Sequence, residues 1–209
     1  MRVRSADPGP DGDLVVATRN EHKLRELQAL LSEHRLVPLP PGVELPPETG
    51  ATFAENARVK ALAAARATGR ATLADDSGIE AAALGGAPGV RSARFAGEGA
   101  SDEENLAKLL REVPDDGDRR VAYVCALVLA PPTGPVVTFE ARCEGTLAAA
   151  PRGSGGFGYD PAFLPLDTGD ERTMAELSDG EKDAISHRGR AARELAAWLA
   201  SVATVPRAP

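Results

Sequence analysis

The sequence predicts an α/β fold in which helices flank a twisted, mixed sheet, and two observations lead to this prediction. Short apolar runs typical of buried strands alternate with segments whose leucines or alanines recur at helical spacing. The 209 residues contain no internal repeat and no break in composition that would mark a second independent domain. A chain of this length fits one large domain or two closely packed lobes. We expect one domain over residues 14–202, with a disordered extension at 1–13 and a flexible tail at 203–209.

The first elements come from one apolar run and one helical pattern. Leu14–Ala17 is a short apolar run suited to a buried strand. Leucines then recur at helical spacing over residues 22–34, and Asn20 is placed to cap that helix. Residues 37–50 are so rich in proline and glycine that we expect an irregular loop.

A second helix has both of its ends marked in the sequence. Thr52 and Glu55 have the spacing of a capping box, and Gly69 is a natural C-terminal stop for the alanine-rich segment between them. Ala71–Ala74 then predicts a short strand. We expect this strand to end abruptly in the acidic, glycine-containing residues 75–78.

The later elements follow the same rules. Ser101 and Glu104 form another capping box in front of a helical pattern. Residues 121–130 and 136–145 are strand candidates separated by a proline- and glycine-containing turn, and a final helix is predicted over residues 190–202.

Charge and composition exclude several classes of protein. A net charge of −7 and a pI near 5.1 argue against binding to nucleic acid or to a membrane surface, since both need a basic field. No apolar stretch approaches the roughly 20 residues of a membrane span, and the opening residues lack a signal core. Cys125 and Cys143 stand singly in apolar runs, so we expect two reduced core thiols in a cytoplasmic protein.

The first candidate site lies where the first strand enters the first helix. A helix N-terminus offers backbone N–H groups and the positive end of the helix dipole to an anion. Lys23 would be disfavoured there by the dipole unless an anionic ligand lay between them. A solvated lysine after a capped helix is the simpler alternative, and His22 fits a flanking position better than an active one. The residues of this segment are Thr18, Arg19, Asn20, Glu21, His22 and Lys23.

The second candidate site is an acidic set. Asp75 and Asp76 are adjacent, and adjacent side chains on a strand point to opposite faces, so they could share a ligand only if the strand broke. Glu48 belongs to the same acidic set, and a carboxylate at a strand end beside a glycine turn is well placed to hold a hard cation through oxygen. Turn-forming aspartates that merely end a strand remain the alternative.

Two further clusters lie in the last third of the chain. Residues 154–161 carry three glycines and two aromatic residues, Phe157 and Tyr159, which could stack on a base, although glycine-rich loops often only turn. A donor-rich cluster at Lys182, His187 and Arg188 precedes the last helix. The alternative is a charged helix entry capped by Ser186.

In this order, the segments resemble the Ham1/inosine-triphosphatase-like family of purine nucleoside-triphosphate pyrophosphatases, from about Leu14 to Leu199. Six ordered blocks make the resemblance far more specific than any single loop. The matching blocks are VVATRNEHKLREL, ETGATFAENARVKA, LADDSG, LGGAPGVRSARFAG, GGFGYDPAF and EKDAISHRGRA. The resemblance implies an elongated α/β fold with two lobes and a central active-site cleft, and it implies a homodimer.

The resemblance also implies roles for individual residues. It assigns Thr18, Asn20, Lys23 and Lys60 to the triphosphate, within a segment that includes Arg19, Glu21 and His22. It assigns Glu48 and Asp76 to Mg²⁺, with Asp76 also accepting a proton. It assigns Ser77 to a substrate contact. It assigns the nucleoside contacts to Phe157, Gly158, Tyr159, Asp160, Lys182, His187 and Arg188.

The implied reaction converts a purine nucleoside triphosphate such as ITP, dITP or XTP, with water, to the monophosphate and pyrophosphate. One position departs from the family, because Arg19 stands where glycine is common. Arginine does not take positive φ freely, so the loop must accept φ below zero, and Arg19 either contacts phosphate or points to solvent. The competing interpretations are a Maf-like pyrophosphatase of other nucleotides and a non-catalytic nucleotide-binding protein.

Overall fold

The computed structural model describes residues 13–203. Most of the predicted N-terminal extension and C-terminal tail, residues 1–12 and 204–209, therefore lies outside the described residues. Asp13, which we assigned to the extension, is buried, and its carboxylate accepts a hydrogen bond of 2.8 Å from the guanidinium of Arg70.

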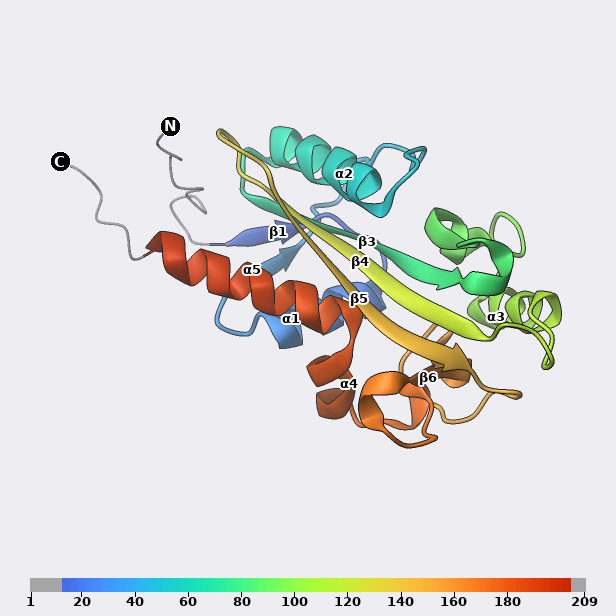
Figure 1. Ribbon diagram of the computed structural model, residues 1–209. Coiled ribbons are helices and arrows are strands. Elements are labelled where there is room, and N and C mark those ends of the chain that lie inside the picture. The colour runs from blue at the N-terminus through green and yellow to red at the C-terminus, as the bar shows by residue number, and fades with distance from the viewer. Residues whose placement is uncertain (1–12, 204–209) are drawn as a thin grey trace. The chain divides into compact units, whose positions relative to one another are not determined.

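Six strands form one sheet in the order β2-β1-β3-β4-β5-β6 (Figure 1). β1 is parallel to both β2 and β3, whereas β5 and β6 are antiparallel, so the sheet is mixed as predicted. The strands are β1 (Leu14–Val16), β2 (Leu36–Pro38), β3 (Thr72–Ala81), β4 (Arg120–Ala130), β5 (Val137–Leu147) and β6 (Phe163–Pro165).

Five α-helices and five short 3₁₀ helices are present in residues 13–203. The α-helices are α1 (Glu21–Leu30), α2 (Phe53–Thr68), α3 (Asp102–Glu112), α4 (Asp179–Ile185) and α5 (His187–Ala203). The 3₁₀ helices are η1 (Ala82–Leu84), η2 (Gly89–Arg94), η3 (Asp160–Ala162), η4 (Leu166–Thr168) and η5 (Met174–Glu176). In the part of the chain described, no helix is long and apolar enough to cross a membrane.

The described residues fall into two compact units. The first holds residues 13–76, 126–140 and 191–203, and the second holds Ser77–Cys125 and Ala141–Arg190. β1, a small stretch of β3 and α2 supply much of the buried apolar surface of the first unit. In the second unit, one apolar cluster includes Ile79, Leu109 and Phe163. Both cysteines are buried free thiols, as predicted.

The capped helices form where the sequence predicts them. Thr52 and Glu55 make a complete capping box at the start of α2, and Gly69 ends this helix with φ of 66°, a left-handed conformation that glycine adopts without a side-chain penalty. Ser101 and Glu104 make the same box at α3. The hydroxyl of Ser186 accepts from the N–H of Gly189 at 3.0 Å, so Ser186 does cap α5.

Two expectations about strands were wrong, and one strand was missed. β3 does not end before the acidic pair but continues to Ala81, because it lies between β1 and β4 in the sheet and keeps pairing partners. β2 lies partly within the predicted loop 37–50, since its pairing with β1 overrides the proline content. β6 follows the glycine-rich loop and pairs with β5, which no local pattern indicated.

Candidate active site

The entry to α1 is stabilised by side chains of its own segment. Asn20 caps the helix, and its Oδ1 accepts from the backbone N–H groups of His22 at 2.9 Å and Lys23 at 3.2 Å. The hydroxyl of Thr18 accepts from the N–H of Asn20 at 3.1 Å. These N–H groups, which we expected to face an anion, are thus already bonded within the protein. Any attraction for phosphate in this segment comes mainly from the side chain of Lys23.

Lys23 has a buried counter-ion. Its ammonium lies 2.5 Å from Oδ1 of Asp75, whose side chain is fully buried. Asp75 had no role in the sequence-based assignment beyond its place in the acidic pair. Because β3 remains extended through this point, Asp75 and Asp76 take opposite sides of the strand, as alternation requires.

Asp76 belongs to a second arrangement, built around helix α2. Its carboxylate accepts from Nδ2 of Asn56 at 3.0 Å and lies 3.4 Å from Nζ of Lys60. The same ammonium donates to the carboxylate of Glu48 and, at 2.9 Å, to the backbone carbonyl of Asp75. Carboxylate oxygens of Glu48 and Asp76 therefore both lie beside the ammonium of Lys60.

Carboxylates outnumber ammonium groups among the five charged side chains of this cluster. The carboxylates are those of Glu48, Asp75 and Asp76, and the ammonium groups are those of Lys23 and Lys60, so the formal sum over these five groups is −1 (two minus three). Burial raises the pKa of Asp76, an effect that the two lysines oppose and Glu48 reinforces. Burial acts against the charge of Lys60, but Asp76 and Glu48 outweigh it and raise the pKa of this lysine. The cluster is suited to gain a further cation.

The residues present fit a magnesium site in which the protein supplies only some of the ligands. Within residues 13–203 no group of three acidic, histidine or cysteine side chains converges as a complete metal site. Mg²⁺ typically keeps several waters and is bound by one or two carboxylates together with substrate phosphates. Glu48 and Asp76, which share one ammonium, meet that description.

In the second unit, Asp160 connects residues 154–161, which we call the aromatic loop, to helix α4. Its carboxylate is buried and accepts from the hydroxyl of Tyr123 at 2.9 Å, the N–H of Phe157 at 2.9 Å and Nζ of Lys182 at 2.8 Å. The ammonium of Lys182 also lies 5.1 Å from the centre of the Phe157 ring. Asp160 thus fixes the positions of two predicted substrate contacts.

The other predicted nucleoside residues lie in the same unit. Nη2 of Arg188, a fully buried residue, donates to the hydroxyl of Ser77 at 2.7 Å, and its guanidinium lies 5.8 Å from the ring centre of Phe157. The ring of His187 stacks on Tyr123 with centres 4.7 Å apart. These contacts bring Ser77, Phe157 and Arg188 together.

Gly158 and Tyr159 have contacts that the sequence did not indicate. The N–H of Gly158 donates to the carboxylate of Asp102 at 2.8 Å, and the hydroxyl of Tyr159 donates to the backbone carbonyl of Ser92 at 2.7 Å. Tyr159 is buried, and burial raises the pKa of its hydroxyl. Of the two aromatic residues expected to stack on a base, Phe157 is the one that is only partly covered.

Sequence reasoning missed Asn56, Tyr123 and Asp102. Asn56 precedes Lys60 by four residues, so helical spacing alone places both on one face of α2 and could have found it. Tyr123 and Asp102 are brought to the aromatic loop by pairing and packing over long sequence distances, and no local signal marks them.

Arg19, Glu21 and His22 are exposed. Arg19 turns its guanidinium to the backbone carbonyls of Leu39, Pro40 and Val43, at 3.1, 3.1 and 2.8 Å. His22 contacts a neighbour on its own helix, with Nδ1 3.0 Å from the guanidinium of Arg25. Within residues 13–203 only glycines have positive φ, so the loop does accept φ below zero at Arg19.

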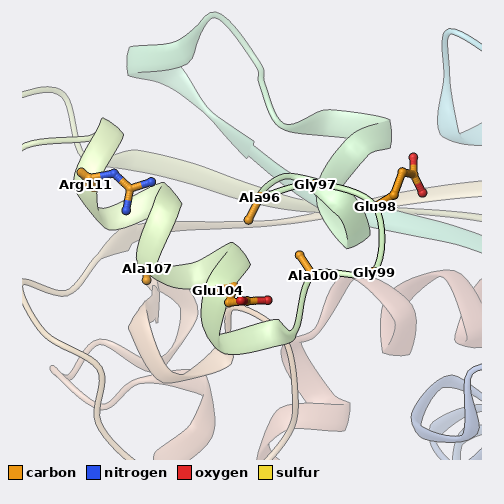
Figure 2. A pocket seen from close by; sticks show the side chains of 8 residues that line it. All are labelled: Ala96, Gly97, Glu98, Gly99, Ala100, Glu104, Ala107 and Arg111. Atoms are coloured by element: carbon orange, nitrogen blue, oxygen red, sulfur yellow. The ribbon is translucent and has the colours of Figure 1, made fainter.

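One open hollow on the second unit contains none of the predicted site residues. It lies between residues 96–100 and one side of α3, from Glu104 to Arg111, as Figure 2 shows. Its lining consists mainly of backbone, alanine side chains and the charged ends of Glu98, Glu104 and Arg111. Nothing in it matches the chemistry of the two clusters described above.

Comparison with known proteins gives consistent matches over most of the chain. A family model described as the Ham1 family matches residues 14–198. A dITP/XTP pyrophosphatase of Syntrophobacter fumaroxidans is 52% identical over 191 residues, which cover 87% of this chain and 79% of that protein. A protein of the same name from Mycobacterium bovis is 50% identical over 204 residues, 91% of this chain and 97% of its own length.

Solved structures agree in fold. A HAM1 protein from Coxiella burnetii has a TM-score of 0.82 and 42% identity, over 90% of this chain and 98% of that chain. A nucleoside-triphosphatase, also described as a dITP/XTP pyrophosphatase, from Mycobacterium abscessus has a TM-score of 0.71 and 46% identity, with the same coverage. The predicted α/β class with a mixed sheet is confirmed.

Proposed function

This chain belongs to the Ham1 family, and we propose that it hydrolyses dITP, XTP and ITP with Mg²⁺ bound by Glu48 and Asp76. It is a nucleoside-triphosphate pyrophosphatase that acts on non-canonical purine nucleotides, by its similarity over most of its length to relatives of that name. The products are the nucleoside monophosphate and pyrophosphate.

The observation that carries the assignment of residues is the convergence of Glu48 and Asp76 on one ammonium, in a cluster with an excess negative charge. Phosphoryl transfer depends mainly on positioning and on offsetting negative charge. Glu48 and Asp76 would hold Mg²⁺ there, and the bound ion would supply positive charge that offsets the negative charge of the phosphates. Lys23 and Lys60 would stabilise the charge of the departing pyrophosphate.

Asp76 is proposed to act on the water that attacks the α-phosphorus. A carboxylate with a raised pKa accepts a proton more readily than an ordinary aspartate, which suits a general base. Asn56 fixes the orientation of this carboxylate by donating to Oδ2.

The base is proposed to be selected by donors of the second unit. Hypoxanthine and xanthine carry an oxygen acceptor at C6, where adenine carries an amino donor. A site rich in donors, such as Lys182, His187 and Arg188, favours the oxygen and leaves the amino group of adenine mismatched. Phe157, which is partly exposed and flanked by two cations, is the side chain proposed to stack on the base.

A substrate panel tests the proposal. We expect release of pyrophosphate from ITP, dITP and XTP in the presence of Mg²⁺. The kcat/KM for ATP should be lower by at least about 100-fold, because a mismatched donor leaves polar groups of the site unpaired. Orthophosphate as the first product, or unchanged turnover in excess chelator, would contradict the reaction and the metal role respectively. Binding of ITP without turnover would identify a nucleotide sensor instead.

The assembly and partners are proposals of the same kind. We infer a homodimer that binds a small nucleotide and no nucleic acid, because the chain is acidic and its family resemblance implies a dimer. Light scattering coupled to gel filtration distinguishes a dimer of about twice the chain mass of 21.7 kDa from a monomer.

A further inference from the structure

We propose that Arg19 is a positioning residue that anchors residues 39–50 and thereby holds Glu48 beside Lys60 and Asp76. This inference rests on the proposed function, since it names a residue that sets the affinity of the site for Mg²⁺. Arg19 stands in the predicted anion-binding segment, but its contacts are with protein. It would therefore act on the metal side of the reaction and not by touching the triphosphate.

The guanidinium of Arg19 gathers three carbonyls from a single segment. Nη1 donates to Leu39 O at 3.1 Å, and Nη2 donates to Pro40 O at 3.1 Å and Val43 O at 2.8 Å. A guanidinium has five donors in a rigid planar fork, so it can bond several acceptors at once. Lysine has a single ammonium on a flexible stem and could not reproduce this arrangement.

The segment that Arg19 binds has few means of fixing itself. It contains Pro40, Pro41, Pro46 and Pro47, none of which has a backbone N–H to donate. After β2 ends at Pro38, the segment has no regular structure before α2. Within residues 39–50, the N–H of Val43 donates to Pro40 O at 3.3 Å and the N–H of Thr49 donates to Pro47 O at 3.1 Å. External anchors therefore decide its position.

Two anchors bracket Glu48. Arg19 holds the segment at residues 39–43, and the N–H of Gly50 donates to Oδ1 of Asn56 at 2.7 Å on its other side. Only four residues separate Val43 from Glu48, and two of them are prolines, which restrict φ and stiffen the chain. A displacement at Val43 is thus transmitted to Glu48 more directly than through a flexible loop.

Arg19 is itself well placed to act as a fixed point. Its neighbours Thr18 and Asn20 are bonded to each other, and Asn20 caps α1. All of these residues, together with Glu48, Asn56, Lys60 and Asp76, belong to the first unit. The Arg19 side chain therefore links the entry of α1 to the acidic cluster within one compact body.

Three variants test the proposal: Arg19→Ala, Arg19→Lys, and Arg66→Ala as a control that removes an exposed arginine from the last turn of α2. The first readout is amide hydrogen exchange of the metal-free protein. We expect Arg19→Ala to speed exchange in residues 42–50 and not in α3, while Arg66→Ala leaves residues 42–50 unchanged.

The second readout is the Mg²⁺ concentration at half-maximal turnover of ITP. We expect it to rise about 10-fold in Arg19→Ala, the lower end of the effect of removing a residue that supports a metal ligand, with kcat at saturating Mg²⁺ nearly unchanged. Arg19→Lys should recover only a part of this loss. In a Glu48→Ala background, Arg19→Ala should add nothing, because both changes remove the same contribution.

The outcomes separate this inference from the proposed function. A higher KM for ITP at saturating Mg²⁺, with unchanged exchange and Mg²⁺ midpoint, would show that Arg19 contacts phosphate and overturn the inference. Additive effects of Arg19→Ala and Glu48→Ala would overturn it as well. If the unmodified protein turned over ITP without metal, the proposed function would fail, whereas the exchange experiment would still decide whether Arg19 anchors residues 39–50.

Discussion

At the scale of single residues, the adjacent carboxylates of Asp75 and Asp76 have separate partners. Asp75 pairs with Lys23, while Asp76 is held by Asn56 and Lys60. The continuous strand makes this division, since it turns neighbouring side chains to opposite sides. The isosteric variants of these two residues should therefore have different effects. Asp76→Asn should lose catalysis, and Asp75→Asn should lose stability.

Asp76→Asn is expected to lower kcat by roughly 10²- to 10⁴-fold, the usual contribution of a general base. The fold should remain intact, because the amide keeps the volume of the carboxylate and removes one charge from a cluster with negative excess. Steady-state turnover of ITP at saturating Mg²⁺ measures the effect. Near-normal turnover would rule out this role for Asp76.

Asp75→Asn is expected to lower the free energy of unfolding by about 3 kcal/mol, the lower end of the cost of breaking a buried ion pair. The lower end applies because the Lys23 side chain is 15% exposed and keeps some contact with water. Urea denaturation of both aspartate variants gives the comparison. Equal stabilities for Asp75→Asn and Asp76→Asn would contradict the division of roles.

The raised pKa of Asp76 predicts how Mg²⁺ binding depends on pH. Burial raises this pKa above the ordinary value of 3.8, so a proton competes with the metal over a higher pH range than at an exposed aspartate. Affinity should be constant at pH values above the raised pKa and should fall as the pH drops through it. Calorimetric Mg²⁺ titrations across pH test this, and the decline should be smaller in Asp76→Asn, which keeps only one of the two proposed carboxylate ligands.

Much of the site could be predicted residue by residue, because carboxylates, lysines and aromatic residues in ordered blocks indicate their chemistry directly. Their actual partners could not be predicted in the same way. For Arg19 we expected a contact with phosphate or with solvent. Its guanidinium instead donates to three backbone carbonyls. Such contacts depend on how residues 39–43 pass the start of α1, which the sequence pattern does not encode.

At the scale of elements, local rules succeeded at helix ends and failed at strand ends. The capping boxes of α2 and α3 involve residues three positions apart, so a short window of sequence contains all that forms them. The ends of β2, β3 and β6 depend on partner strands that are distant in sequence. Pairing therefore overrode the prolines near β2 and the glycine in β3.

The cap of α2 carries an element-level prediction, since this helix presents Asn56 and Lys60 to the acidic cluster. Thr52→Ala removes the side chain that accepts from the N–H of Glu55 and should cost about 1 kcal/mol of stability. Thr52→Ser keeps that acceptor and should behave like the unmodified protein. Thermal or urea unfolding distinguishes them, and equal losses in both variants would show that the hydroxyl contributes nothing.

At the scale of the whole molecule, each compact unit holds one of the two sets of proposed residues. Glu48, Lys60 and Asp76 lie in the first unit, and Phe157 and Arg188 lie in the second. The boundary falls in β3 between Asp76 and Ser77, which are consecutive in the chain. The sequence predicted the mixed sheet and both sets of residues, but no composition change marks the boundary between the units.

The two sets of residue roles predict how the enzyme treats a substrate without a nucleoside. Inorganic triphosphate offers phosphates to Lys60 and Asp76 but no base to Phe157, so kcat/KM should be lower than for ITP by at least about 100-fold, because binding energy from the remote part of a substrate contributes to catalysis. Phe157→Leu, which removes the ring but keeps an apolar side chain, should lower kcat/KM for ITP and leave that for triphosphate unchanged. Asp76→Asn should lower both. If Phe157→Leu reduced the hydrolysis of triphosphate as strongly as that of ITP, Phe157 would act on the phosphate chemistry or on folding, and the assignment of the base to the second unit would be wrong.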